Sequence, residues 1–130
     1  MPSENNKPPD TEPTMRLLAR PQDTNFAGDI FGGWIMSQVD IAGSIVASRK
    51  AKGRVVTVAV KEIQFHKPVY VGDLVSCYAT ITRIGTTSIT VLVEVYAERN
   101  PADPVCIKVT QATLTYVAVD ADGKPRPVNQ

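Results

Sequence analysis

One aspartate in a long apolar stretch is the side chain of this 130-residue sequence best suited to chemistry. Between Ile30 and Ser48, Asp40 is the only ionisable residue. Burying a carboxylate costs free energy unless it is paired or hydrated, and burial also tunes its basicity. Gly32 and Gly33 open the same stretch, where the free N–H groups of a helix N-terminus favour negative charge. A carboxylate and such donors are together suited to attack on a carbonyl, whose developing oxyanion the N–H groups stabilise.

Each of these residues also has a purely structural interpretation. Asp40 can bond a neighbouring serine or an interface group, and the two glycines can form a plain tight turn into a helix. Asn25 lies in a loop, where its amide can orient a water or a carbonyl, although ordinary asparagine turn chemistry is the favoured interpretation. Asp29 is expected to anchor this loop or to cap the helix.

Other kinds of site have less support. His66 is the only histidine and stands at the end of a predicted strand, so we expect a surface or interface residue rather than part of a triad. One histidine and two cysteines without short spacing predict no metal site. No phosphate loop of the Walker or Rossmann type is present. The turn at residues 83–88 combines a cation, a glycine and three hydroxyls and can bind phosphate, although most such turns are plain hairpins.

The element that carries Asp40 is predicted to be a helix from Trp34 to about Lys50. One apolar face of this helix contains Ile35, Val39, Ala42, Gly43 and Val46. A second, nearly opposite face contains Trp34, Ile41 and Ile45. A helix that is apolar on two sides is buried on two sides. We therefore expect a sheet to cover one face and a second subunit to cover the other.

The rest of the chain is predicted to be mostly β-structure. A first strand is expected at residues 15–19, followed by a loop at 20–33, and long strands at 55–65, 73–84, 86–98 and 105–119. The alternation in residues 55–65 changes phase near Lys61 and Glu62, which predicts a β-bulge there. These elements predict an α+β fold with one helix against a curved antiparallel sheet. Residues 14–120 form the domain, between a disordered N-terminal tail at 1–13 and a loose C-terminal tail at 121–130.

Bulk properties narrow the choice of partner and compartment. A formal net charge of +1 gives no reason to expect a nucleic-acid or membrane surface. No apolar run reaches transmembrane length, and residues 1–13 lack the apolar middle of a secretory signal. These absences favour the cytoplasm, where Cys77 and Cys106 are expected to be buried, unpaired side chains.

The motif DTNxxGDIFGGWxMSQxD at residues 23–40 resembles the signature of the bacterial hotdog-fold acyl-CoA thioesterases. The resemblance continues through GRVVTV at 53–58, PVxVGD at 68–73, GTTS at 85–88 and YVAVD at 116–120, and so covers nearly everything except the two tails. It implies a hotdog fold, in which an antiparallel sheet wraps a long central helix. It also implies a homo-oligomer, a dimer at least and commonly a hexamer built as a trimer of dimers.

The resemblance further implies hydrolysis of acyl-CoA thioesters to free fatty acid and coenzyme A, which is a product and not a cofactor. Asp40 matches the family's catalytic carboxylate, as general base or nucleophile. Asn25 matches an asparagine supplied by the opposite subunit, and Gly33, with Gly32, matches the backbone donor to the thioester carbonyl. The residues expected to contact coenzyme A are Arg54, Arg83, Gly85, Thr86, Thr87 and Ser88. His66 has no counterpart in the pattern.

Two rival activities on the same fold are weaker. A non-catalytic acyl-CoA sensor needs no base, so the presence of Asp40 argues against it. A hydratase or dehydratase usually needs a histidine beside an acid on the helix, and no histidine occurs there. The candidates to line an acyl tunnel are Phe31, Trp34, Met36 and Phe65.

Overall fold

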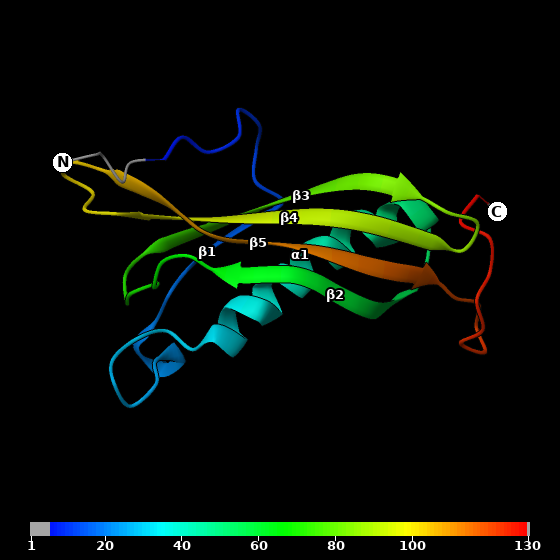
Figure 1. The fold of residues 1–130 in the computed structure, drawn as a ribbon, viewed down its shortest axis with the longest axis horizontal. Helices are drawn as coiled ribbons and strands as arrows, with labels where there is room; N and C mark the ends of the chain where they lie inside the picture. The colour runs from blue at the N-terminus through cyan, green and yellow to red at the C-terminus, as the bar shows by residue number, and fades with distance from the viewer. Residues whose placement is uncertain (1–5, 130) are drawn as a thin grey trace.

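The structure is a computed structural model that describes residues 6–129. Within that range one long helix packs on a five-stranded antiparallel sheet, which confirms the predicted α+β arrangement (Figure 1). The sheet order is β1-β3-β4-β5-β2. Its strands are β1 (Met15–Leu18), β2 (Val55–Phe65), β3 (Leu74–Ile84), β4 (Ser88–Arg99) and β5 (Val105–Ala118). The predicted loop before the helix contains a short 3-10 helix, η1 (Pro21–Asp23).

The helix, α1 (Gly32–Ala51), begins two residues earlier than predicted. Phe31, not Asp29, is the N-cap residue of the helix. Lys52 is its C-cap, and the left-handed backbone of that residue (φ 55°) terminates the last turn. The face toward the sheet buries Ile35, Gln38, Val39, Ala42, Gly43, Ala47 and Ala51. Of the predicted second apolar face, Ile41 is 47% exposed, whereas Trp34 and Ile45 are half-buried and Trp34 packs against the core. Neither α1 nor any other helix in the described residues is long and apolar enough to cross a membrane.

The last strand in the sheet order, β2, contains a bulge and carries exposed apolar side chains. Its pairing with β5 shifts register between Lys61 and Gln64, where Glu62 has a positive φ of 57°, and this confirms the bulge predicted from the broken alternation. A second shift, between Thr57 and Ala59, was not predicted. Val58 is 55% exposed, and no strand within residues 6–129 pairs with the outer side of β2. A long apolar edge of this kind is typical of a surface that another chain covers.

The two cysteines are buried thiols, as predicted, and lie in different clusters. Cys77 belongs to the main core between sheet and helix. Cys106 packs with Tyr78 and Tyr96 in a separate small cluster, where the two rings meet edge to face at 5.7 Å. Burial raises the pKa of the Cys77 thiol to about 12. A buried thiol of this kind is a packing residue rather than a nucleophile.

Cys77 is therefore expected to resist thiol reagents in the native protein. A pKa near 12 in place of 9.0 lowers the thiolate fraction at pH 8 by about 10³-fold, and only the thiolate reacts. In a Cys106→Ser variant, labelling by a maleimide should proceed only as the protein unfolds in guanidinium, with Cys77→Ser as the matched control. Rapid labelling of Cys77 in native protein would contradict the burial.

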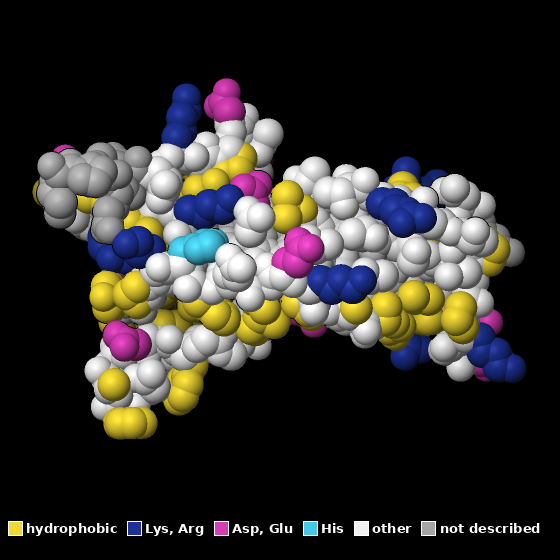
Figure 2. Space-filling model, in the orientation of Figure 1, with side chains coloured by type: hydrophobic (Ala, Val, Ile, Leu, Met, Phe, Trp, Pro, Cys, Tyr) yellow, Lys and Arg dark blue, Asp and Glu magenta, His cyan; other side chains and the backbone are white. Residues whose placement is uncertain are grey.

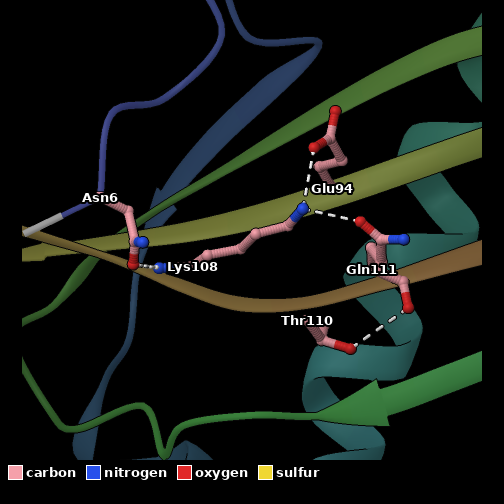
Figure 3. Close-up of polar contacts among 5 residues, drawn as sticks. All are labelled: Asn6, Glu94, Lys108, Thr110 and Gln111. Carbon is pink, nitrogen blue, oxygen red and sulfur yellow. Dashed lines mark hydrogen bonds and ion pairs between the residues drawn. The ribbon is translucent and has the colours of Figure 1, made fainter. Parts of the chain in front are cut away.

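The described part of the N-terminal segment contacts the sheet. Residues 1–5 of the predicted disordered tail lie outside the described residues. Figure 3 shows Asn6 beside β5, where the backbone N–H of Lys108 donates to its Oδ1 at 2.6 Å, and the Asn6 N–H donates to the Cys106 carbonyl at 2.6 Å. Lys108 Nζ donates to Glu94 and Gln111 at 3.1 and 2.7 Å (Figure 3). Asn6 thus links the N-terminal segment to the first residues of β5 by hydrogen bonds.

The C-terminal segment differs from the loose tail that the sequence predicted. The Asp120 carboxylate accepts hydrogen bonds from the backbone N–H groups of Asp122 and Lys124, which closes a turn. Arg126 Nη2 donates to the carbonyl of Ala51, at the end of α1, at 2.7 Å. Val128 is 2% exposed and belongs to the core. Prolines on both sides of Arg126 prevent a strand there, but they do not prevent an extended segment from packing.

Candidate active site

Asp40 lies near the middle of α1 and is half-buried. Its Oδ1 accepts two hydrogen bonds, from Thr57 Oγ1 at 2.8 Å and from Tyr116 Oη at 2.9 Å. Thr57 and Tyr116 are opposite residues in the pairing of β2 with β5, so the sheet presents both hydroxyls to the helix side by side. The structural interpretation that Asp40 bonds a nearby serine does not hold, since its donors come from the sheet.

Neither Thr57 nor Tyr116 was predicted from the sequence as a site residue. Tyr116 is fully buried, and its pKa is raised by burial first and then by its hydrogen bond to Asp40 and the charge of that carboxylate. Its place in β5 was readable, because Leu114, Tyr116 and Ala118 alternate on the inner face. The missing signal was the register that sets this hydroxyl opposite Asp40.

The start of α1 forms a second half of the candidate site. The first hydrogen bond of the helix is donated by Trp34 to Phe31, so the N–H groups of Gly32 and Gly33 precede the helical bonding pattern. Beside them is a cavity of about 340 Å³. It is lined by Asn25, Asp29, Ile30, Gly32, Ile35, Phe65, His66, Lys67, Pro68 and Val69. Helix N-termini with free N–H groups bind oxyanions and other anions.

Asn25 and His66 are both placed at this cavity, and Phe65 is the tunnel candidate found there. Asn25 Oδ1 accepts from the backbone N–H groups of Ala27 and Asp29 at 2.9 and 3.1 Å, as predicted for asparagine turn chemistry. These bonds orient the side chain through its oxygen and do not use its amide nitrogen. His66 is exposed, as expected, and basic side chains lie next to the histidine on the face shown in Figure 2.

No candidate metal centre was found among residues 6–129, since no three or more His, Cys, Asp or Glu side chains gather there. The cavity at the helix start contains one histidine and one aspartate, His66 and Asp29. The other polar residues that line this cavity are Asn25 and Lys67.

The two halves of the candidate site are separated within one chain. Gly33 and Asp40 are seven residues apart in α1, which is about 10 Å along the helix axis. Asp40 does not line the cavity at Gly32. A carbonyl held by the first-turn N–H groups is thus beyond the reach of the Asp40 carboxylate in the same chain. The geometry requires a second copy if these groups act on one substrate.

The residues predicted to contact coenzyme A lie at the opposite end of α1. The N–H of Val119 donates to the Arg54 carbonyl, and the N–H of Ala118 donates to the Thr87 carbonyl, so the start of β2 and the β3–β4 turn share this end. Arg83 is exposed at an irregularity near the end of β3. A cavity of about 370 Å³ at the end of α1 is lined by Lys50, Lys52, Val128 and Asn129.

The turn at residues 85–88 is held firmly in place. The Gly85 N–H donates to the Ser88 carbonyl at 2.8 Å, and the Thr86 carbonyl accepts from the Val128 N–H at 2.9 Å. A Cβ at position 85 would lie 2.6 Å from Ser88 Oγ, so a side chain there would displace the Ser88 hydroxyl. The hydroxyls of Thr86, Thr87 and Ser88 are thus carried on a fixed backbone next to the C-terminal segment.

Comparisons with known proteins agree on one family. Residues 27–102 match the Thioesterase superfamily. The acyl-CoA thioester hydrolase YciA of Salmonella typhimurium is 52% identical over 122 residues, which are 92% of each chain. A crystal structure of a hexameric hotdog-fold thioesterase of Campylobacter jejuni is similar with a TM-score of 0.86 and 48% identity over 90% of each chain. This similarity confirms the predicted hotdog fold.

A more distant structure is the acyl-CoA hydrolase of Staphylococcus aureus, solved with butyryl coenzyme A and coenzyme A. It has a TM-score of 0.80 and 31% identity over 87% of this chain and 68% of that chain. Two single-alanine variants of that hydrolase have also been solved, one replacing an aspartate and one a threonine 17 residues further along.

Proposed function

The chain belongs to the Thioesterase superfamily, and we propose that it hydrolyses acyl-CoA thioesters to a free fatty acid and coenzyme A. The observation that carries the proposal is Asp40, a half-buried carboxylate in an apolar helix whose Oδ1 is bonded by Thr57 and Tyr116. Asp40 and Thr57 are 17 residues apart, as are the aspartate and threonine replaced in the Staphylococcus aureus hydrolase. Asp40 is accordingly the catalytic carboxylate in this proposal.

The reaction follows from the two halves of the site. The first-turn N–H groups of Gly32 and Gly33 and the Asn25 amide hold the thioester carbonyl and stabilise the oxyanion that forms on it. Asp40 takes a proton from a water whose oxygen attacks the carbonyl carbon, or attacks that carbon itself to form a mixed anhydride that water then opens. The C–S bond breaks, and coenzyme A departs as a thiolate that is then protonated. This route uses no cofactor.

The site is completed by a second copy of the chain. The outer edge of β2 and the side of α1 around Ile41 both carry exposed apolar side chains. A band of hydrophobic side chains along the β2 side of the molecule is visible in Figure 2. Pairing through these surfaces would set Asn25 and Gly33 of one chain opposite Asp40 of the other. We expect a dimer as the smallest active unit and a hexamer as the assembly, like that of the Campylobacter jejuni thioesterase.

Coenzyme A is expected to place its phosphates at the C-terminal end of α1. Arg54, Arg83 and the turn at residues 85–88 gather there, and Lys50 and Lys52 line the neighbouring cavity. Arginine and lysine donors with hydroxyls on a fixed turn suit phosphate oxygens. The buried thiols of Cys77 and Cys106 fit a reducing compartment, and the cytoplasm is the expected location.

The decisive experiment is thiol release from a panel of acyl-CoA esters of increasing chain length. We expect wild-type protein to release free coenzyme A, detected with a chromogenic disulfide reagent, and the fatty acid in equal amount. The two buried cysteines keep the background low. Tight binding of acyl-CoA without release at any chain length would overturn the hydrolase and favour a sensor.

A further inference from the structure

We infer that Tyr116 is a positioning residue, whose hydroxyl fixes one oxygen of the Asp40 carboxylate so that the other faces the reactants. The inference rests on the proposed function and adds a residue to it. Tyr116 is fully buried, and its Oη lies 2.9 Å from Asp40 Oδ1 and 2.9 Å from the Asp40 backbone carbonyl. A phenol has one proton, and the charged carboxylate oxygen is the stronger acceptor of the two. The hydroxyl therefore donates to Oδ1.

Two donors on the same oxygen determine how the carboxylate lies. Thr57 Oγ1 also donates to Oδ1, from the opposite position on β2. Two donors that reach one oxygen from the sheet leave the carboxylate little freedom to rotate and direct Oδ2 away from the sheet. Oδ2 is then the oxygen available to a water or a thioester. A general base or nucleophile works best when it is held in one orientation before the substrate arrives.

Gly43 shows that the surrounding fold is built around this contact. A Cβ at position 43 would lie 2.3 Å from Tyr116 Oη and 3.0 Å from two of its ring carbons. Gly43 follows Asp40 by three positions and so lies on the same side of the helix, one turn later. A glycine at this position is what lets the phenol reach the Asp40 carboxylate from the sheet.

The register of β2 adds to the same arrangement. Thr57 is the last residue of β2 in pairing with β5 before the register shifts, and its partner is Tyr116. The shift leaves Val58 outside the pairing and 55% exposed, toward the surface proposed for the second chain. In this irregular part of β2, the Thr57 hydroxyl therefore points to Asp40 and the next side chain, Val58, is exposed on the outside.

The test is Tyr116→Phe, measured as the pH dependence of kcat and kcat/KM in the full-length oligomer. Loss of a hydrogen bond to a charged group should lower kcat by about 10- to 10²-fold while KM stays within about twofold. The acidic limb of the kcat/KM profile should move to higher pH, because the carboxylate loses a donor that stabilises its charged form. Tyr78→Phe is the matched control, because Tyr78 is also a buried tyrosine but belongs to the small cluster with Tyr96 and Cys106. It should leave kcat and the acidic limb unchanged.

A second pair of variants separates positioning from packing. Gly43→Ala should impair kcat by displacing the hydroxyl, and combining it with Tyr116→Phe should add little further loss, since the two changes break one contact. If Tyr116→Phe does not fold, 3-fluorotyrosine at position 116, a stronger donor, should move the acidic limb to lower pH instead.

Each alternative result has one meaning. Unchanged kcat in Tyr116→Phe, or a lower kcat with an unmoved acidic limb, would overturn the inference and leave Tyr116 as a packing residue. If the wild type releases no thiol from any acyl-CoA ester, the proposed function itself fails. If the wild type is active and Asp40→Asn is not, failure at Tyr116 concerns this inference alone.

Discussion

The Asp40→Asn variant is expected to lose at least about 10²-fold in kcat for acyl-CoA hydrolysis, the scale of a lost general base or nucleophile. Asparagine keeps an oxygen that accepts hydrogen bonds from Thr57 and Tyr116, so the site should keep its shape while losing its negative charge. The measurement is the rate of coenzyme A release under saturating substrate, together with thermal unfolding to show that the fold is retained.

The control for this substitution is Asp103→Asn, an exposed aspartate in the turn between β4 and β5. It should behave as wild type. If Asp40→Asn also hydrolyses acyl-CoA at the wild-type rate, Asp40 is a structural or recognition residue, and the catalytic assignment is wrong. If Asp40→Asn loses activity as expected, single-turnover hydrolysis in ¹⁸O water separates the two routes, since label that first appears in the Asp40 carboxylate excludes direct attack by water on the thioester.

Mixing two inactive variants is expected to restore activity, because the site is shared between chains. Asp40→Asn removes the carboxylate, and Asn25→Ala removes a carbonyl donor worth about 10²-fold in kcat. In a dimer with one chain of each kind, one site carries both substitutions and the other carries neither. Random reassortment gives such dimers half of the time, so roughly one quarter of the wild-type activity should return.

This prediction depends on the separation of about 10 Å between Gly33 and Asp40 along α1. The measurement is thiol release after the two variants are unfolded together and refolded. Mixing them in the native state, before chains exchange, provides the control and should give only the mean of the two parents. The same mean after co-refolding would show that the site lies within a single chain.

Much of the architecture was predictable because local patterns determine it. The apolar stretch with its two glycines predicted α1 within two residues of its start, and the broken alternation at Lys61 and Glu62 predicted the bulge in β2. Asp40 stood out because an unpaired charge is rare in such a helix. These features depend on neighbours within about one or two turns of the chain.

What the sequence did not predict depends on long-range register. Thr57 and Tyr116 are ordinary strand residues until β2 and β5 pair and set them opposite Asp40. The packing of Val128 beside the β3–β4 turn was equally hidden, since nothing in a proline-containing tail indicates that its valine is buried. His66 lies at the cavity at the start of α1 because β2, the last strand in the sheet order, ends there at Phe65.

Gly43 represents a conflict between local preference and tertiary demand. Within a helix, glycine is less favourable than alanine by roughly 0.5–1 kcal/mol, so this position weakens α1 taken alone. The surrounding residues are otherwise those of a stable buried helix, and local rules would select alanine here. Such a disagreement is the pattern expected where selection has favoured activity over stability. In the middle of α1, Gly43 thus lowers the stability of the helix and leaves room for the Tyr116 hydroxyl beside Asp40.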